Sequence, residues 1–253
     1  MVKILIVFID KKDKGMKRAL FGASLLLSLL YGVENEDLKQ ALEGGFIATT
    51  GNSKSSTVNA EYRLRYEYGK NTEMKFSTDM LYGKKKGKTS NERYRANFDL
   101  KRYYGDDLFY YFELYYLKNR FEGYKHQINT GFGLGYKIIN KNQETLLGLG
   151  GLLMRYNSYT GEKKSELLSF VKLSADYKYK IDRKNSFVSK WYFMSNVEDL
   201  SDYESGLKSK LVFKLNSRLA FNVGFEVKYD NTPPEKNIYK TDTTTKIGIS
   251  YDF

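Results

Sequence analysis

Apolar and polar residues alternate along most of this chain of 253 residues. The C-terminal stretch is the clearest case, because Phe253, Tyr251, Ile249 and Ile247 are separated by single polar residues or glycine. Successive side chains of a strand point to opposite faces, so this stretch predicts a strand with one apolar and one polar face. The chain stops on the aromatic side chain of Phe253.

The same alternation, interrupted by turn residues, predicts about twelve strands of about ten residues, a length that suits a tilted strand crossing a membrane. In two of these segments, 146–156 and 187–195, the pattern does not show which residues lie on the apolar face and which on the polar face. The predicted strands cover residues 44–50, 58–68, 74–82, 93–101, 108–116, 128–138, 146–156, 171–182, 187–195, 207–215, 219–230 and 243–253.

The connections between these strands alternate between tight turns, such as 140–142, and longer polar loops, such as 83–90. Tyrosines gather near both strand ends, where rings with a polar tip suit the two membrane–water interfaces. We therefore predict an all-β fold, a transmembrane antiparallel β-barrel of about twelve strands in the bacterial outer membrane. Outer-membrane lipid would surround it, and barrel-assembly machinery would read Tyr251 and Phe253. The alternative is a soluble barrel.

The composition narrows the possible functions. Cysteine is absent, and no apolar run approaches the roughly 18 residues that a membrane helix needs. The net charge of +12 raises the question of nucleic-acid binding. The basic residues are spread along the whole chain and no nucleic-acid motif is present, so we expect no nucleic-acid partner.

The N-terminal region resembles a secretion signal. The basic start Met16-Lys17-Arg18 precedes about a dozen apolar residues up to Leu30, too few to span a bilayer as a helix. We therefore predict that 1–32 is a signal peptide region whose true start could be Met16, and the alternative is a buried helix. Residues 33–42 then form a short periplasmic segment, and 43–253 form the barrel.

Two short motifs suggest a family. The stretch Thr50-Gly51-Asn52-Ser53 follows the opening strand, and near the end Asp230-Asn231-Thr232-Pro233-Pro234 precedes a strand that begins with Thr241-Asp242-Thr243. This layout, over residues 44–253, resembles the YdiY-type, salt-induced outer-membrane proteins. The resemblance implies a barrel in the Gram-negative outer membrane. It carries no established catalytic or binding residues, so we expect neither an enzyme nor a cofactor.

The polar face is the candidate functional surface. Basic residues exceed the acidic residues that are expected to face inward with them. In one interpretation the charges pair across strands and fill the lumen, which gives the barrel a structural or envelope-stress role. In the other, the excess lines a narrow, porin-like channel that prefers small anions. The lumen-lining candidates are Arg63, Arg65, Arg93, Arg95, Lys172, Lys178, Lys208, Lys210, Lys214, Lys228 and Lys246.

His126, the single histidine, raises a third interpretation, an outer-membrane lipid hydrolase. Such an enzyme needs a serine beside the histidine and a third group to orient the ring. No adjacent serine can be identified, so we expect His126 to cap the loop at 122–125. We also expect no metal site, although the acidic residues Glu198, Asp199, Asp202 and Glu204 could hold a divalent cation in a surface loop.

Overall fold

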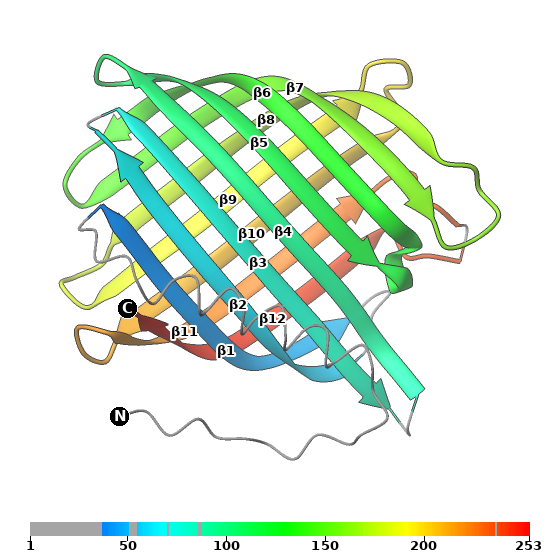
Figure 1. Cartoon of the computed structure of the whole chain (residues 1–253), viewed down its shortest axis with the longest axis horizontal. Helices are drawn as coiled ribbons and strands as arrows, with labels where there is room; N and C mark the ends of the chain where they lie inside the picture. The colour runs from blue at the N-terminus through cyan, green and yellow to red at the C-terminus, as the bar shows by residue number, and fades with distance from the viewer. Residues whose placement is uncertain (1–36, 51–54, 70, 86–87, 236) are drawn as a thin grey trace. The chain divides into compact units, whose positions relative to one another are not determined.

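The computed structural model describes residues 37–50, 55–69, 71–85, 88–235 and 237–253. Within them, twelve strands form a closed antiparallel barrel in which each strand pairs with the next and the first pairs with the last (Figure 1). This confirms the predicted fold. The signal peptide region 1–32 with the start at Met16, and the turn residues 51–53, lie outside the described residues. The elements are β1 (Leu38–Thr50), β2 (Ser55–Tyr68), β3 (Thr72–Lys85), β4 (Lys88–Tyr104), β5 (Leu108–Asn119), η1 (Arg120–Glu122), β6 (Tyr124–Asn140), β7 (Glu144–Tyr159), β8 (Glu166–Lys180), β9 (Asn185–Asn196), β10 (Tyr203–Lys214), β11 (Leu219–Asp230) and β12 (Thr241–Asp252).

The strands extend beyond their predicted bounds. β1 begins at Leu38, so residues 38–42 belong to the barrel wall and not to a periplasmic segment of residues 33–42. Leu38 pairs with Tyr66 on β2, and the Phe253 N–H donates to the Gln40 carbonyl. Pairing on both sides thus keeps this stretch extended although its own pattern is weak. In the same way, β3 and β4 continue into the loop predicted at 83–90, because the two strands pair as far as Lys85 and Lys88.

The two faces of the wall differ as the alternation predicts. Outward residues such as Phe132, Leu173 and Ile249 are more than half exposed, whereas Glu43 and Asp79 face inward and are buried. The structure also settles the two ambiguous segments. On β7, Leu152, Met154 and Tyr156 are exposed while Leu153, Arg155 and Asn157 are buried, and on β9 Trp191 is outward while Lys190, Tyr192 and Met194 line the lumen.

Glycines on the inner face of β6 and β7 make room for aromatic rings of β5. Tyr111 lies against Gly133 and Gly151, and a β-carbon at Gly151 would collide with the Tyr111 hydroxyl and with backbone of β6. The ring of Phe109 covers Gly135 in the same way. At Gly133, Gly135 and Gly151 the inward aromatic rings therefore occupy the space that a side chain would take.

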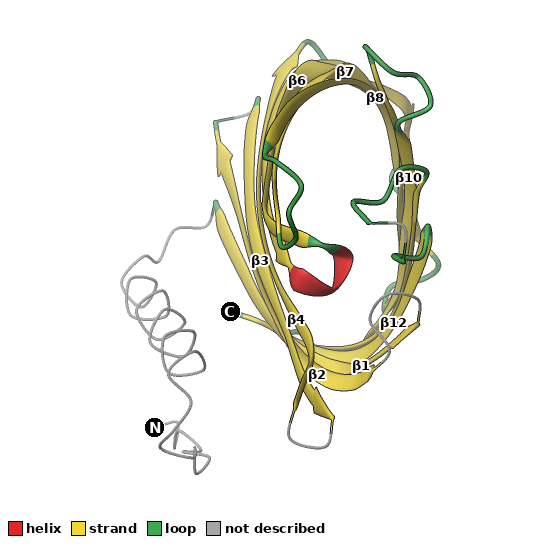
Figure 2. Ribbon diagram, turned by 90° about the vertical axis from the view of Figure 1, so that its right-hand side faces the viewer, coloured by secondary structure: helices red, strands yellow, loops and turns green. Residues whose placement is uncertain are grey.

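A short helical turn, η1, follows β5 on the side of the longer loops. Figure 2, which looks along the barrel, shows η1 in red within the outline of the strands. The Asn119 side chain accepts a hydrogen bond from the Phe121 N–H and caps the turn, and Gly123 ends it with a φ of 83°. The Thr160 N–H donates to the Gly123 carbonyl, so the β7–β8 loop is tied to η1. No helix in the described part of the chain has the length and apolar character needed to cross a membrane.

Candidate functional site in the barrel lumen

The barrel encloses a lumen cavity of about 320 Å³. Its lining combines uncharged polar groups such as Asn129 with apolar side chains such as Leu153 and Met194. Among the described residues it also contains seven basic and eight acidic side chains, so the cavity lining is almost neutral. The basic ones are Arg93, Arg95, Arg155, Lys172, Lys190, Lys208 and Lys228, and the acidic ones are Glu61, Asp79, Asp99, Glu113, Glu122, Glu204, Glu226 and Asp242.

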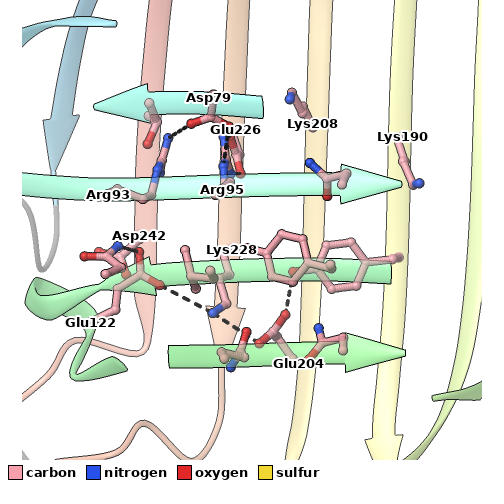
Figure 3. Close-up of a pocket in the computed structure, with 18 of the residues that line it drawn as sticks. Asp79, Arg93, Arg95, Glu122, Lys190, Glu204, Lys208, Glu226, Lys228 and Asp242 are labelled. Carbon is pink, nitrogen blue, oxygen red and sulfur yellow. Dashed lines mark hydrogen bonds and ion pairs between the residues drawn. The ribbon is translucent and has the colours of Figure 1, made fainter. Parts of the chain in front are cut away.

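Arg95 bridges the lumen (Figure 3). Its Nε donates to Asp79 Oδ1 on the neighbouring strand β3 at 2.6 Å, and its Nη1 donates to Glu226 Oε1 at 2.7 Å. Glu226 belongs to β11, which lies five steps from β4 around the twelve-stranded wall. The Arg95–Glu226 ion pair therefore connects nearly opposite sides of the barrel. Its two charges neutralise each other inside the lumen.

Other ion pairs also join strands that are not neighbours in the wall. Each places its charged groups over the lumen, where they occupy space and offset one another. These pairs join Lys172 Nζ to Glu113 Oε1 at 2.6 Å, Lys101 Nζ to Asp176 Oδ2 at 3.3 Å and Lys210 Nζ to Glu43 Oε2 at 2.7 Å.

Glu204 is the centre of a further network toward the long-loop side. It accepts a hydrogen bond from the Tyr192 hydroxyl at 2.6 Å and pairs with Arg155 at 3.4 Å and with Lys228 at 3.2 Å. Lys228 also reaches Glu122 of η1 at 3.5 Å, so the network holds this turn over the lumen (Figure 3). The placement of Glu204 in a surface loop was wrong, because β10 begins at Tyr203 and turns the Glu204 side chain inward.

The basic residues singled out from the sequence fall into three groups. Arg93, Arg95, Lys172, Lys208 and Lys228 line the lumen cavity. The second group consists of residues beside carboxylates at other levels of the lumen. Arg63 and Lys210 contact Glu43, Arg65 contacts Glu73, and Lys246 lies 3.9 Å from Glu61.

The third group, Lys178 and Lys214, lies at the short-turn end of β8 and β10. Both side chains are exposed, and Lys178 lies within electrostatic reach of Arg65, Lys180 and Lys214. A second cavity of about 650 Å³ lies at the same end, lined by the turns at Gly69, Gly105 and Asn140 among others. The lining of this second cavity is acidic on balance, with Glu67, Glu73, Asp106 and Asp107 against Arg65 and Lys137, so Lys178 and Lys214 lie near acidic as well as basic groups.

Arg155, Lys190 and Lys101 are lumen cations that the predicted set of lumen-lining residues does not contain. Arg155 and Lys190 lie in the segments whose facing was ambiguous, so their direction could not be read from the alternation. Lys101 ends the predicted strand 93–101, and the alternation places it on the same polar face as Arg93 and Arg95, so this pattern could have found it.

Comparisons with known proteins agree with this architecture. A family model described as "Protein of unknown function, DUF481" matches residues 42–253. The chain belongs to this family. It is 25% identical over 214 residues to "Uncharacterized protein YdiY" of Escherichia coli (strain K12), which covers 83% of this chain and 81% of that protein. The predicted YdiY-type family is thereby confirmed.

Two solved structures share the fold of this DUF481 barrel. The NanC porin aligns with a TM-score of 0.54 and 8% identity over 83% of this chain and 98% of its own. The translocator domain of the autotransporter NalP from Neisseria meningitidis aligns with a TM-score of 0.50 and 10% identity over 93% and 96%. Both likenesses concern the fold alone.

The hydrogen-bond partner of His126 is a tyrosine, although Ser158 of β7 lies opposite His126 in the strand register. The His126 Nδ1 lies 3.0 Å from the hydroxyl of Tyr116 on β5. The expectation that His126 caps the loop at 122–125 was wrong, because the cap is Asn119, whose side chain accepts the Phe121 N–H.

The acidic residues Asp199 and Asp202 of the β9–β10 loop accept hydrogen bonds from groups in and beside the same loop. Asp199 accepts hydrogen bonds from the Ser201 hydroxyl at 2.7 Å and the Ser201 N–H at 3.0 Å, and these bonds lower the pKa of the Asp199 carboxyl. Asp202 accepts from the Asn196 side chain at 3.0 Å. Across the described ranges of the chain, no group of three or more His, Cys, Asp and Glu residues is arranged to hold a metal ion.

Proposed function

We propose that this DUF481 protein is a structural barrel of the bacterial outer membrane whose lumen is closed to ordinary solutes by paired charges. The outward face supports the membrane location. Phe132, Leu152, Leu173 and Ile249 each expose more than half of their surface. Apolar exposure on this scale is rare on soluble monomers and is expected of a wall that contacts lipid.

The observation that carries the proposal is the Arg95 bridge between β4 and β11. A twelve-stranded barrel is intermediate between the filled barrels of about eight strands and the open channels of about sixteen, so its side chains decide whether it conducts. Here the Arg95 guanidinium and the Asp79 and Glu226 carboxylates lie across the lumen. The Glu204 network and η1 lie on the long-loop side of them. Such paired groups close the passage and add cross-wall ties that stabilise the barrel.

Recording from the purified barrel in planar lipid bilayers tests the proposal. We expect the wild type to show no steady open-pore conductance. The double variant Arg95→Met, Glu226→Met removes the bridge without changing the net charge and should introduce conductance. Lys39→Met, Glu67→Met is the matched control, because this exposed pair joins neighbouring strands at 3.8 Å and does not cross the lumen. A large, steady conductance in the wild type would contradict the proposal.

A narrow anion-preferring channel is the second candidate, and one observation favours it. Lys178, Lys180 and Lys214 are exposed at the short-turn mouth, and none has an ion-pair partner among the residues that the structure describes. Unpaired positive charge at a pore mouth attracts anions and repels cations.

Reversal potentials under a salt gradient test this candidate. This candidate requires that the wild type conducts and prefers anions, and that Lys178→Glu with Lys214→Glu shifts the reversal potential toward cations. Lys164→Glu, in the β7–β8 loop at the opposite end of the barrel, is the control for a charge change away from this mouth. Cation preference in the wild type would refute the candidate.

A further inference from the structure

Two buried cations beside the Arg95 bridge have hydrogen-bond donors without an acceptor among the described residues, and a third, exposed cation lies near them. Arg93, Lys208 and Lys246 come from β4, β10 and β12 and form what we call the lumen cation cluster. Arg93 and Lys246 are only 7% and 8% exposed. Arg93 Nε, Arg93 Nη2 and Lys246 Nζ are buried without a hydrogen-bond acceptor among the described residues. Buried donors of this kind call for an ion or water as their partner.

The neighbouring carboxylates do not satisfy these donors. Arg95 takes both oxygens of Glu226 and one oxygen of Asp79. The other Asp79 oxygen lies 3.8 Å from Arg93 Nη2, and the nearest carboxylate oxygen of Glu61 lies 3.9 Å from Lys246 Nζ. Both separations exceed hydrogen-bonding distance.

The local charges also fail to cancel. Arg93, Lys208 and Lys246 each interact electrostatically with both Asp79 and Glu226, so the three cations surround the same two carboxylates. Together with Arg95 they make four positive charges, against three negative charges when Glu61 is included. One positive charge is therefore left over among these groups. Arg93 and Lys246 are buried, where an uncompensated charge is costly, whereas Lys208 is exposed.

We propose that the lumen cation cluster binds one small monovalent anion, either a halide or the carboxylate group of a solute. One such anion cancels the surplus charge and accepts hydrogen bonds from the guanidinium and the ammonium groups. Arg93 and Lys208 border the lumen cavity, so a small anion reaches them from the cavity. The site is independent of conduction, because a closed barrel and an open one hold the same cluster.

Anomalous scattering from crystals of the wild-type barrel grown in sodium bromide tests the location. We expect a bromide peak among Arg93, Lys208 and Lys246 in the wild type. The peak should vanish in Lys246→Met and persist in Lys214→Met, an exposed lysine six positions along β10 from Lys208. A wild-type crystal without this peak overturns the proposal, as does a peak that Lys246→Met leaves unchanged.

A solution measurement identifies the anion and covers the case in which Lys246→Met does not fold. Chloride NMR line broadening by the detergent-solubilised barrel reports anions that exchange with the site. Arg93→Gln should weaken the apparent chloride affinity about tenfold or more, the effect of losing a charge-assisted hydrogen bond. Displacement of chloride by formate indicates a carboxylate site, and failure of formate to displace it indicates a halide site. Equal broadening by wild type and Arg93→Gln refutes the cluster as the binding site.

Discussion

Replacing Arg95 with methionine should destabilise the barrel strongly. The Arg95 side chain is 10% exposed and donates three hydrogen bonds, at 2.6 Å to Asp79 and at 2.7 and 3.3 Å to Glu226. The Asp79 and Glu226 side chains are 7% and 22% exposed. Methionine fills part of the same volume, but it leaves both carboxylates without their guanidinium.

Removal of one partner from a buried ion pair costs about 3–5 kcal/mol, because the remaining charge stays buried without compensation. We expect Arg95→Met to lower the free energy of unfolding by about this amount. Adding Glu226→Met removes one of the stranded carboxylates, so the double variant should be more stable than Arg95→Met alone. A double-mutant cycle then isolates the coupling between the two side chains.

Urea unfolding of the barrel in lipid vesicles provides the assay. Trp191 is the single tryptophan and faces outward with 41% exposure, so its fluorescence reports contact with lipid. Lys39→Met is the control, because Lys39 is 67% exposed in a pair at 3.8 Å and such pairs contribute about 0–1 kcal/mol. Equal losses for Arg95→Met and Lys39→Met would refute the assignment of Arg95 as a cross-lumen tie.

Three further predictions concern packing, assembly and chemistry. Gly151→Ala should cost about 1–3 kcal/mol in the same unfolding assay, because its β-carbon would overlap the Tyr111 hydroxyl. Gly150→Ala should be tolerated, since its β-carbon would lie 3.4 Å from Leu173, and equal losses for the two variants would contradict the packing. Phe253→Lys should reduce assembly into the outer membrane far more than a change at Asp252, because the Phe253 ring is 60% exposed toward the expected lipid, and immunoblots of membrane fractions measure this. His126→Ala should leave any lipid deacylation unchanged, and a wild-type activity that the variant lacks would establish the hydrolase interpretation.

The sequence predicted the wall of the barrel well because alternation is a local property. Each outward residue such as Ile249 is recognised from its immediate neighbours, and repeating this along the chain gives the strands and their faces. The facing of β7 was not accessible in this way, because leucine and glycine occupy both faces. It is decided by the packing of Tyr111 on Gly133 and Gly151, which depends on how β5, β6 and β7 are aligned.

The partners inside the lumen depend on more than local alternation. Arg95 and Glu226 are 131 residues apart and meet only because the strands tilt and close at a particular stagger. A count of inward residues measures the charge of the polar face, but it does not show which charges cancel. Lys210 was counted among the basic residues in excess on the polar face, yet Glu43 of β1 lies 2.7 Å from it. Since paired charges produce little field at a distance, selectivity in such a barrel would follow the unpaired positions, of which Lys178 and Lys214 lie at the mouth.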